Sequence, residues 1–242
     1  MRKLDNTEVK KYILNILCEF AAFCDQNGLR YYLSGGTLLG AVRHKGFIPW
    51  DDDVDLLMPR PDFDKLHDLL RKENIRPYYK LISLQMGNSF WPFAKIIDTR
   101  TYVKNEYSNV DQHLWIDIFP MDGLPDDKEE SDILLSKAEP LKKWINRCSA
   151  TIGKGKGFVR SIVKIPMILF LRMYTPERIG RKLDKLAHRY DFDKQEYIGG
   201  VAWSLGPNER MKKKEYLPYN DVEFCGKKFH APACWKFYLT QI

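Results

Sequence analysis

The chain has 242 residues, 44% of them hydrophobic and 29% charged, and its 39 Lys and Arg against 32 Asp and Glu give a formal net charge of +7. These values are typical of a globular protein and exclude collagen-like, disordered and disulfide-scaffold chains. The best apolar run, at 165–171, is much shorter than the about 18 residues of a membrane-spanning helix, and the polar start at 1–5 predicts no signal segment. We therefore expect one large domain, or a core with an appended lobe.

The five cysteines are scattered along the chain and form no Cys-x-x-Cys pair. This spacing favours small, buried apolar side chains in a reducing cytoplasm over a structural zinc site. The cysteine pattern therefore predicts a cytoplasmic protein.

The first half of the chain alternates helix and strand patterns. Apolar residues at spacings of three and four predict a helix over 7–26, ended by Gly28. A short strand at 31–33 then leads into Ser34-Gly35-Gly36-Thr37 and a brief helix over 37–42. The other elements expected here are a strand in which Val54, Leu56 and Met58 alternate with Asp53, Asp55 and Leu57, a helix opening at Pro61, and strands at 80–84, 93–97 and 115–119, closed by Asp122-Gly123 and Pro125.

From about residue 126 the pattern changes to helices, and a strand or hairpin is expected near 222–229. The order of elements predicts an α/β (α+β) fold with a small mixed sheet flanked by helices. We expect residues 1–125 to form a catalytic core. Residues 126–242 are expected to form a mainly helical, basic lobe with a C-terminal hairpin, packed on the core as one unit.

Positive charge is concentrated in the second half. Residues 141–190 contain 13 Lys and Arg against two acidic residues, so this segment carries +11 and the rest of the chain −4. Within it, 158–174 mixes basic and apolar residues, as an interfacial helix on an anionic membrane does. A buried helix of the second lobe, or an ordinary solvated face, explains the same composition. Because basic and apolar residues occur together, our hypothesis is contact with a membrane.

The most informative stretch is Phe47-Ile48-Pro49-Trp50-Asp51-Asp52-Asp53-Val54-Asp55. Side chains alternate along a strand, so Asp51, Asp53 and Asp55 are expected on one face and Asp52 away from them. Gathered carboxylates repel one another and raise each other's pKa, a cost that a divalent cation removes. Oxygen ligands of this kind suit Mg²⁺ or Mn²⁺. The alternative is a solvated acidic loop in which one Asp caps a helix.

A glycine-rich triplet, Gly35-Gly36-Thr37, stands between a predicted strand and a predicted helix. Such glycines let backbone N–H groups approach a phosphate at a helix N-terminus, although the same triplet occurs in ordinary tight turns. Arg43 and His44 close this helix, where they complement its C-terminal dipole or contact a phosphate.

Two charged residues interrupt otherwise apolar strands. Asp117 stands within 114–119 and Lys95 within 93–97. A buried charge is costly unless it is paired or coordinated. Each residue is therefore expected either to have a partner or to face water.

The run Gly36-Thr37-Leu38-Leu39-Gly40-Ala41-Val42-Arg43-His44, with the acidic stretch that follows it, resembles the signature of the LicD family. That family includes bacterial phosphocholine transferases and resembles the fukutin-related sugar-modifying enzymes. The similarity continues through Met58-Pro59-Arg60 and residues 116–123, and more weakly at Phe224-Cys225-Gly226 and Tyr238-Leu239. It spans most of the chain.

The resemblance implies a nucleotidyltransferase-like fold in which Asp53, Asp55 and Asp117 are the catalytic carboxylates. With Asp51 they would surround Mg²⁺ or Mn²⁺, Asp117 serving as ligand or as base. The residues expected to bind the donor are Gly35, Gly36, Thr37, Arg43, His44 and Lys95.

The resemblance also implies a reaction and its partners. The donor would be a CDP-linked alcohol, above all CDP-choline, and the acceptor a sugar hydroxyl of a cell-surface glycan, a lipid-linked saccharide or a teichoic acid precursor. A choline group calls for an aromatic box, for which Trp91, Trp115 and Trp203 are candidates. We expect the enzyme in the cytoplasm, at the inner face of the cell membrane.

Alternative functions come from other classes. In the first alternative the transferred group is glycerol phosphate or ribitol phosphate instead of phosphocholine. In the second, the enzyme transfers a nucleotidyl group to RNA or to a small molecule. Because the basic residues lie away from the acidic strand, we expect no nucleic acid partner. A non-catalytic binding protein is the last alternative, but it has no need of clustered acids on one strand.

Overall fold

The computed structural model describes residues 2–103, 113–149, 175–203 and 209–242. Its first element, helix α1 (Asn6–Asn27), confirms the helix predicted over 7–26. The Asp5 carboxylate accepts a hydrogen bond from the Glu8 N–H, and the Glu8 carboxylate accepts one from the Asp5 N–H, so the two residues cap the helix reciprocally. Gly28 ends it with φ +62°, as predicted.

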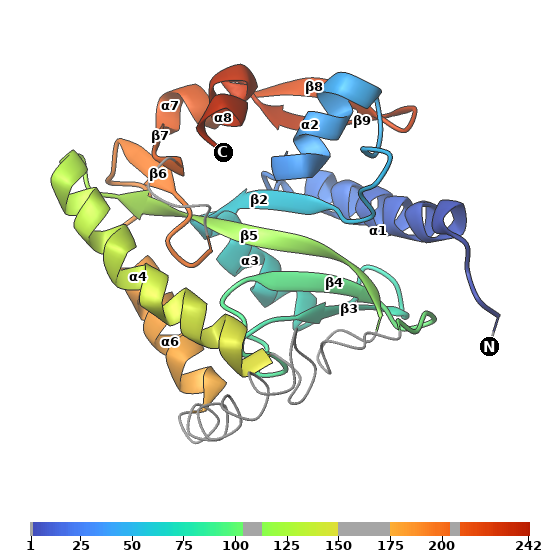
Figure 1. Cartoon of the computed structure of the whole chain (residues 1–242), viewed down its shortest axis with the longest axis horizontal. Coiled ribbons are helices and arrows are strands. Elements are labelled where there is room, and N and C mark those ends of the chain that lie inside the picture. The colour runs from blue at the N-terminus through green and yellow to red at the C-terminus, as the bar shows by residue number, and fades with distance from the viewer. Residues whose placement is uncertain (1, 104–112, 150–174, 204–208) are drawn as a thin grey trace, which may run out of the picture.

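A mixed sheet forms the centre of the fold (Figure 1). Its main path runs through β1 (Tyr32–Leu33), β2 (Asp55–Pro59), β5 (Leu114–Leu124), β4 (Ala94–Asp98) and β3 (Tyr79–Ile82). Strands β2 and β5 are parallel, and the other neighbours on this path are antiparallel. Beyond it, β6 (Tyr197–Gly199) pairs with the end of β5, and β7 (Met211–Lys212) pairs with β6. The predicted mixed sheet is confirmed, and β6 and β7 are additions that the sequence did not indicate.

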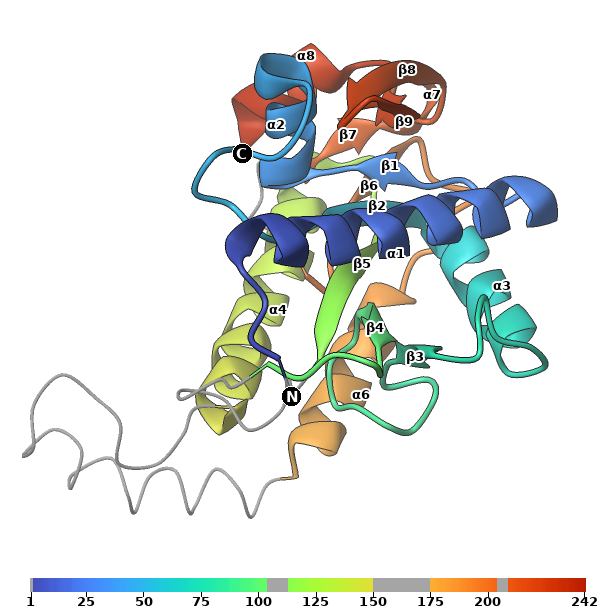
Figure 2. The same cartoon turned by 90° about the vertical axis from the view of Figure 1, so that its right-hand side faces the viewer.

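Helices surround this sheet on several sides (Figures 1 and 2). Helices α1 and α3 (Arg60–Leu70) contact β5, and α4 (Lys128–Ser149) packs along α6 (Pro176–Ala187). Above β2 in Figure 1 lie α2 (Gly35–His44), α7 (Lys213–Tyr216), the hairpin of β8 (Tyr219–Phe224) and β9 (Lys227–Pro232), and α8 (Trp235–Gln241). The hairpin predicted near 222–229 is therefore confirmed. Across the described ranges, every helix is too short or too polar to cross a bilayer.

Two hydrophobic clusters form the core. The larger contains apolar residues of α1, α3, the central strands and the C-terminal hairpin. The second gathers Trp91, Phe93 and Leu124 with the apolar faces of α4 and α6. Both clusters draw residues from either side of residue 125. The division into a core at 1–125 and a lobe at 126–242 stays a prediction.

A buried ion pair joins α3 to β5. The Arg60 Nε donates to Asp122 Oδ1 at 2.7 Å, and Nη2 lies 2.6 Å from the same oxygen. Asp122 is completely buried, and its other oxygen accepts from the backbone N–H groups of Val201 and Ala202. Because a buried charge needs such partners, this network fixes the start of α3 and the end of β5 to the segment after β6.

Three predicted boundaries are wrong. The helix expected over 37–42 begins at Gly35, so the glycines form its first turn. The acidic strand begins only at Asp55, because β1 ends at Leu33 and offers no partner to earlier residues. Strand β5 continues through Asp122 and Gly123 instead of ending before them, because β6 pairs with those residues.

Two further expectations concern the cysteines and the segment 158–174. Cys24 is buried, as expected for a cysteine in a core, but Cys225 is exposed at the turn of the β8–β9 hairpin with φ +52°. The role predicted for the cysteines is therefore wrong for Cys225. The segment 158–174, for which membrane contact was hypothesised, lies outside the described residues.

Candidate active site

Strand register brings three of the predicted residues side by side. Asp55 on β2 pairs with Asp117 on the parallel β5, and Asp117 pairs with Lys95 on the antiparallel β4. Because side chains alternate along a strand, Trp115 and Phe119 share the less buried face of β5 with Asp117. One face of the sheet therefore carries two carboxylates, a lysine and two aromatic rings.

Asp117 is held by its neighbours on that face. The Lys95 Nζ lies 3.1 Å from Asp117 Oδ1, and the Trp115 Nε1–H donates to Asp117 Oδ2 at 2.7 Å. The Lys95 ammonium also stands 4.2 Å from the centre of the Trp115 ring. Both charged side chains are nearly buried, with 10% and 14% exposure. Of the two alternatives left open by the sequence, a partner or exposure to water, the structure shows the first, because Lys95 and Asp117 form an ion pair with each other.

The backbone of Asp55 is fixed from both sides. Its N–H donates to the Thr37 hydroxyl at 2.9 Å, and its carbonyl accepts from the Ser34 N–H at 3.0 Å. On the neighbouring strand, the Asp117 N–H donates to the Val54 carbonyl at 2.9 Å. These bonds tie the first turn of α2 to the start of β2, so the carboxylate of Asp55 is carried on a rigid part of the fold.

Asp51 and Asp53 lie close to the other acids, but they are not on the strand where we expected them. They lie in the segment that enters β2, not on the strand itself. The Asp51 carboxylate rests on the first turn of α2, where a Cβ added to Gly36 would lie 2.7 Å from Asp51 Oδ2. Glycine at 36 is thus required for this approach, and the positive end of the α2 dipole favours the negative charge.

The carboxylates change one another's acidity. Burial first, and then the charges of Asp117, Asp53 and Asp51, raise the pKa of Asp55 to about 8, against a lowering influence of Lys95. Burial, a hydrogen bond with Asp51 and the nearby charges raise the pKa of Asp53 to about 6. The predicted mutual repulsion of these acids is therefore present in the fold.

The donor chemistry of this cluster fits a divalent cation. All four carboxylates offer oxygen, the ligand that Mg²⁺ and Mn²⁺ prefer, and a cation would relieve the repulsion that raises the pKa of Asp53 and Asp55. As they stand, no three His, Cys, Asp or Glu side chains of the described ranges are arranged to hold a metal ion. Locally, Asp117 is turned to Lys95 and Trp115, and Asp51 to Gly36.

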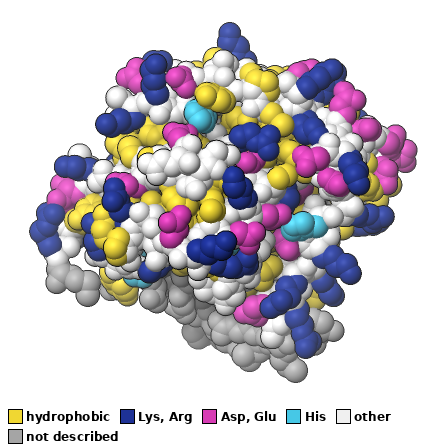
Figure 3. Space-filling model, turned by 180° about the vertical axis from the view of Figure 1, so that it is seen from behind, with side chains coloured by type: hydrophobic (Ala, Val, Ile, Leu, Met, Phe, Trp, Pro, Cys, Tyr) yellow, Lys and Arg dark blue, Asp and Glu magenta, His cyan; other side chains and the backbone are white. Residues whose placement is uncertain are grey.

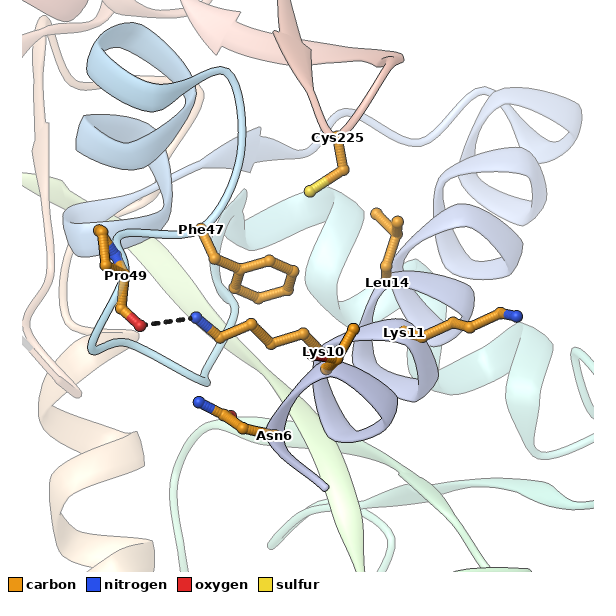
Figure 4. A pocket seen from close by; sticks show the side chains of 8 residues that line it. Asn6, Lys10, Lys11, Leu14, Phe47, Pro49 and Cys225 are labelled. Carbon is orange, nitrogen blue, oxygen red and sulfur yellow. Dashed lines mark hydrogen bonds between the residues drawn. The ribbon is translucent and has the colours of Figure 1, made fainter. Parts of the chain in front are cut away.

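A lysine of α1 anchors the segment that carries Asp51. The Lys10 Nζ donates to the Ile48 carbonyl oxygen at 3.2 Å and to the Pro49 carbonyl oxygen at 3.0 Å, and Figure 4 shows the second of these bonds. It lies in an open pocket of about 430 Å³ between the start of α1, the segment at 47–49 and the turn of the hairpin. Beside this anchor, Trp50 is 85% exposed. Lys10 was not predicted, since nothing in its local sequence indicates a contact so far along the chain.

Arg43 and His44 lie away from the acids. Both are exposed in the last turn of α2, while Gly35 and Gly36 lie in its first turn. A helix rises about 1.5 Å per residue, so the two ends are about 12 Å apart along the axis. Contact of Arg43 and His44 with a donor phosphate stays a prediction.

The C-terminal helix supplies a residue that sequence reasoning noted only as a weak family echo. The Tyr238 hydroxyl lies 2.7 Å from the Ser34 Oγ, at the cap of α2, and the side chain is buried. Burial raises the pKa of Tyr238, so the hydroxyl stays protonated. Helix α8 lies beside α2 in both ribbon views (Figures 1 and 2), and the contact of Tyr238 with Ser34 joins residues that are 204 positions apart in the sequence.

On the face opposite to that of Figure 1, Lys and Arg side chains lie among Asp and Glu side chains (Figure 3). A nucleic acid backbone is attracted by a continuous field of one sign. The described part of this face has a mixed pattern instead.

Comparison of the chain with known proteins identifies first the type of domain and then the family. The profile of the LicD/FKTN/FKRP nucleotidyltransferase domain matches residues 28–139, which include Asp51, Asp53, Asp55 and Asp117. Over its whole length the chain is 30% identical to lipopolysaccharide cholinephosphotransferase LicD of Haemophilus influenzae, covering 91% of that protein. The chain therefore belongs to the LicD family, which is a family of transferases.

A shorter similarity involves a second kind of transferase. Over 49 residues, 20% of this chain and 8% of the relative, the identity to the human and mouse ribitol 5-phosphate transferase FKRP is 47%. An uncharacterised Rickettsia prowazekii protein is 34% identical over 76 residues, 28% of this chain and 29% of that protein. The resemblance expected from the sequence is confirmed.

Proposed function

We propose that this enzyme transfers phosphocholine from CDP-choline to a sugar hydroxyl of a cell-surface glycan precursor. The observation that carries the proposal is the meeting of Asp53, Asp55 and Asp117 at the glycine-opened start of α2. The whole-length similarity to a lipopolysaccharide cholinephosphotransferase supports choline as the alcohol. We place the reaction in the cytoplasm, at the inner face of the cell membrane, where lipid-linked acceptors are presented.

Asp53 and Asp55, with Asp51 and Asp117 beside them, would hold Mg²⁺ or Mn²⁺. A bound ion of this kind supplies charge neutralisation at the donor diphosphate and orients its oxygens. The residues of the chain do the rest. The first turn of α2 offers backbone N–H groups to the donor phosphates at Gly36 and Thr37.

Lys95 and Asp117 act as a pair. Asp117 forms an ion pair with Lys95 through Oδ1 and accepts a hydrogen bond from Trp115 at Oδ2, so this carboxylate is oriented, as a ligand fixed by its neighbours is. Lys95 places a positive charge next to the site, where it compensates the acids until a donor binds. We therefore favour Asp117 as an oriented ligand over Asp117 as the base.

A panel of CDP-alcohols tests the proposal. Purified enzyme is incubated with Mg²⁺ and CDP-choline, CDP-ribitol or CDP-glycerol, with and without a lipopolysaccharide acceptor, and CMP release is measured. We expect acceptor-dependent CMP release from CDP-choline that EDTA and the Asp53→Asn variant abolish and the Asp68→Asn control on α3 leaves intact. Release that persists in EDTA would refute the metal assignment.

Ribitol phosphate is the second candidate for the transferred group. The similarity to the ribitol 5-phosphate transferase FKRP favours ribitol phosphate, because the identity is high over the short stretch that the two proteins share. The same panel decides between the two alcohols. Faster CMP release from CDP-ribitol than from CDP-choline would establish ribitol phosphate as the transferred group.

A further inference from the structure

A small cavity opens directly beside Asp55. Its volume is about 90 Å³. The lining residues come from β1 and the cap of α2, from β2 and β5, and from the C-terminal part of the chain: Ser34, Gly35, Asp55, Leu57, Phe119, Trp203, Glu209 and Tyr238. Pockets for whole drug-sized ligands measure about 300–1,000 Å³, so this one suits a single small group and not a nucleotide.

The cavity stands at a defined distance from the carboxylates. Leu57 on β2 pairs with Phe119 on β5, two residues further along the same strands than the pair of Asp55 with Asp117. Strands rise about 3.3 Å per residue, so the two pairs are about 6–7 Å apart. A phosphocholine group spans a distance of this order from its terminal phosphate oxygens to the methyl groups of its ammonium. A group held at the Leu57–Phe119 level is thus within reach of a phosphate held at the Asp55–Asp117 level.

The walls combine aromatic rings with negative charge. The Phe119 and Trp203 rings are nearly parallel, with an angle of 11° between their planes and 6.2 Å between their centres. Trp203 is fixed in turn by Phe93 at 5.0 Å and by the edge of Trp91 at 5.6 Å. Glu209, which is 8% exposed, supplies a carboxylate, and Asp55 lines the side of the cavity that borders the acidic cluster. None of the described residues that line the cavity is basic.

These features match one ligand chemistry. Aromatic faces and carboxylates attract a cation, and a quaternary ammonium has no N–H to satisfy, so it needs no hydrogen-bond acceptor of fixed geometry. A ribitol or glycerol group, by contrast, carries several hydroxyls that require polar partners when buried. We propose that this cavity binds the quaternary ammonium headgroup of the transferred phospho-alcohol, with Trp203, Phe119 and Glu209 as the residues that select it. This inference rests on the proposed function, because it assigns the alcohol-binding part of the same site.

Binding of choline alone tests the cavity without any need for turnover. Affinities for choline and for its neutral isostere 3,3-dimethylbutan-1-ol are measured by titration calorimetry on the full chain. Cation–aromatic attraction of the usual size predicts that choline binds at least about tenfold more tightly than the isostere. Equal affinities, or no choline binding at concentrations where CDP-choline saturates, would overturn the proposal.

Variants separate recognition from folding. Trp203→Leu should weaken choline binding about tenfold, while Trp203→Phe, which keeps an aromatic face, should stay within about threefold of the wild type. Glu209→Gln keeps the shape of the side chain and should weaken choline but not the neutral isostere. Trp144→Leu, in the same hydrophobic cluster but away from the cavity, is the matched control and should bind choline normally.

The outcomes distinguish this proposal from the proposed function. If choline binds with the expected profile and no CDP-alcohol is turned over, the cavity assignment stands and the transferase proposal fails. If CDP-choline is turned over with the same KM by wild type, Trp203→Leu and Glu209→Gln, the transferase proposal stands and the cavity assignment fails. A loss of CMP affinity in Trp203→Leu without a loss of choline affinity would mean that the cavity holds the base, which also overturns it.

Discussion

Replacing Asp55 by Asn should stabilise the metal-free protein, and increasingly so as the pH rises. In the folded protein the pKa of Asp55 is about 8, whereas the ordinary value is 3.8. Between these two values the native protein holds a proton that the unfolded chain has released. Stability then falls with rising pH, the opposite of the usual behaviour of a salt-bridged carboxylate.

The size of this effect follows from the shift. Each pH unit in the window costs about 1.4 kcal/mol, which over the whole window approaches 6 kcal/mol as an upper bound. Asp53 and Asp51 contribute to the repulsion in the same cluster, so removing the Asp55 charge relieves only part of it. We therefore expect the free energy of unfolding of Asp55→Asn, relative to that of the wild type, to be about 2–4 kcal/mol higher at pH 8 than at pH 5. The exposed Asp68, replaced by Asn, is the matched control and should follow the wild type at both pH values.

Urea unfolding in EDTA at pH 5, 6.5 and 8 measures the difference. The stability curves of Asp55→Asn and wild type should converge toward pH 5 and separate toward pH 8. Adding Mg²⁺ should then stabilise the wild type at pH 8, by about 2.7 kcal/mol at a hundred times its dissociation constant, and leave Asp55→Asn unchanged. Parallel pH profiles for the two proteins would show that Asp55 does not hold a proton in the folded state over this pH range.

Three other substitutions test the supports of the site. Gly36→Ala should displace the Asp51 carboxylate and lower Mg²⁺ affinity at least about tenfold in a calorimetric titration, because ligand positions tolerate little error; unchanged affinity would remove Asp51 from the site. Thr37→Val loses the acceptor for the first N–H of β2 and should cost about 1–2 kcal/mol in urea unfolding, while Thr37→Ser should retain most of the stability; equal losses would contradict this role. Lys95→Met leaves Asp117 without its nearly buried partner and should cost about 3 kcal/mol at pH 8, and Lys95→Met with Asp117→Asn should recover part of it; additive losses would show that the two residues are not coupled.

The sequence predicted the parts of the site that are close together along the chain. Alternation and clustering identified the acids at 51–55, and the spacing of apolar residues identified α1 within a residue at each end. The charge argument for Asp117 and Lys95 left pairing and exposure open, and only the register of β5 with β4 shows that each is the other's partner. A single sequence carries no record of such register.

Other parts of the site depend on contacts between distant segments. The helix α2 begins at Gly35, where the Ser34 carbonyl accepts from the Leu38 N–H and the Ser34 N–H donates to the distant Asp55 carbonyl, which a local pattern of apolar residues does not reveal. Tyr238 reaches Ser34, and Trp203 and Glu209 reach the neighbourhood of Asp55, only once the C-terminal part of the chain packs above β2. The aromatic residues were visible as candidates, but their spacing in the sequence does not say which of them share a cavity.

The proposed function requires that the acids gathered at the start of β2 drive the transfer of a phospho-alcohol. The most direct test is the transfer of labelled phosphocholine from CDP-choline to a lipopolysaccharide acceptor in Mg²⁺, with wild type and Asp55→Asn compared at equal, verified folding. The wild type should transfer the label, and Asp55→Asn should show only background transfer. Transfer by Asp55→Asn at the wild-type rate would contradict this requirement.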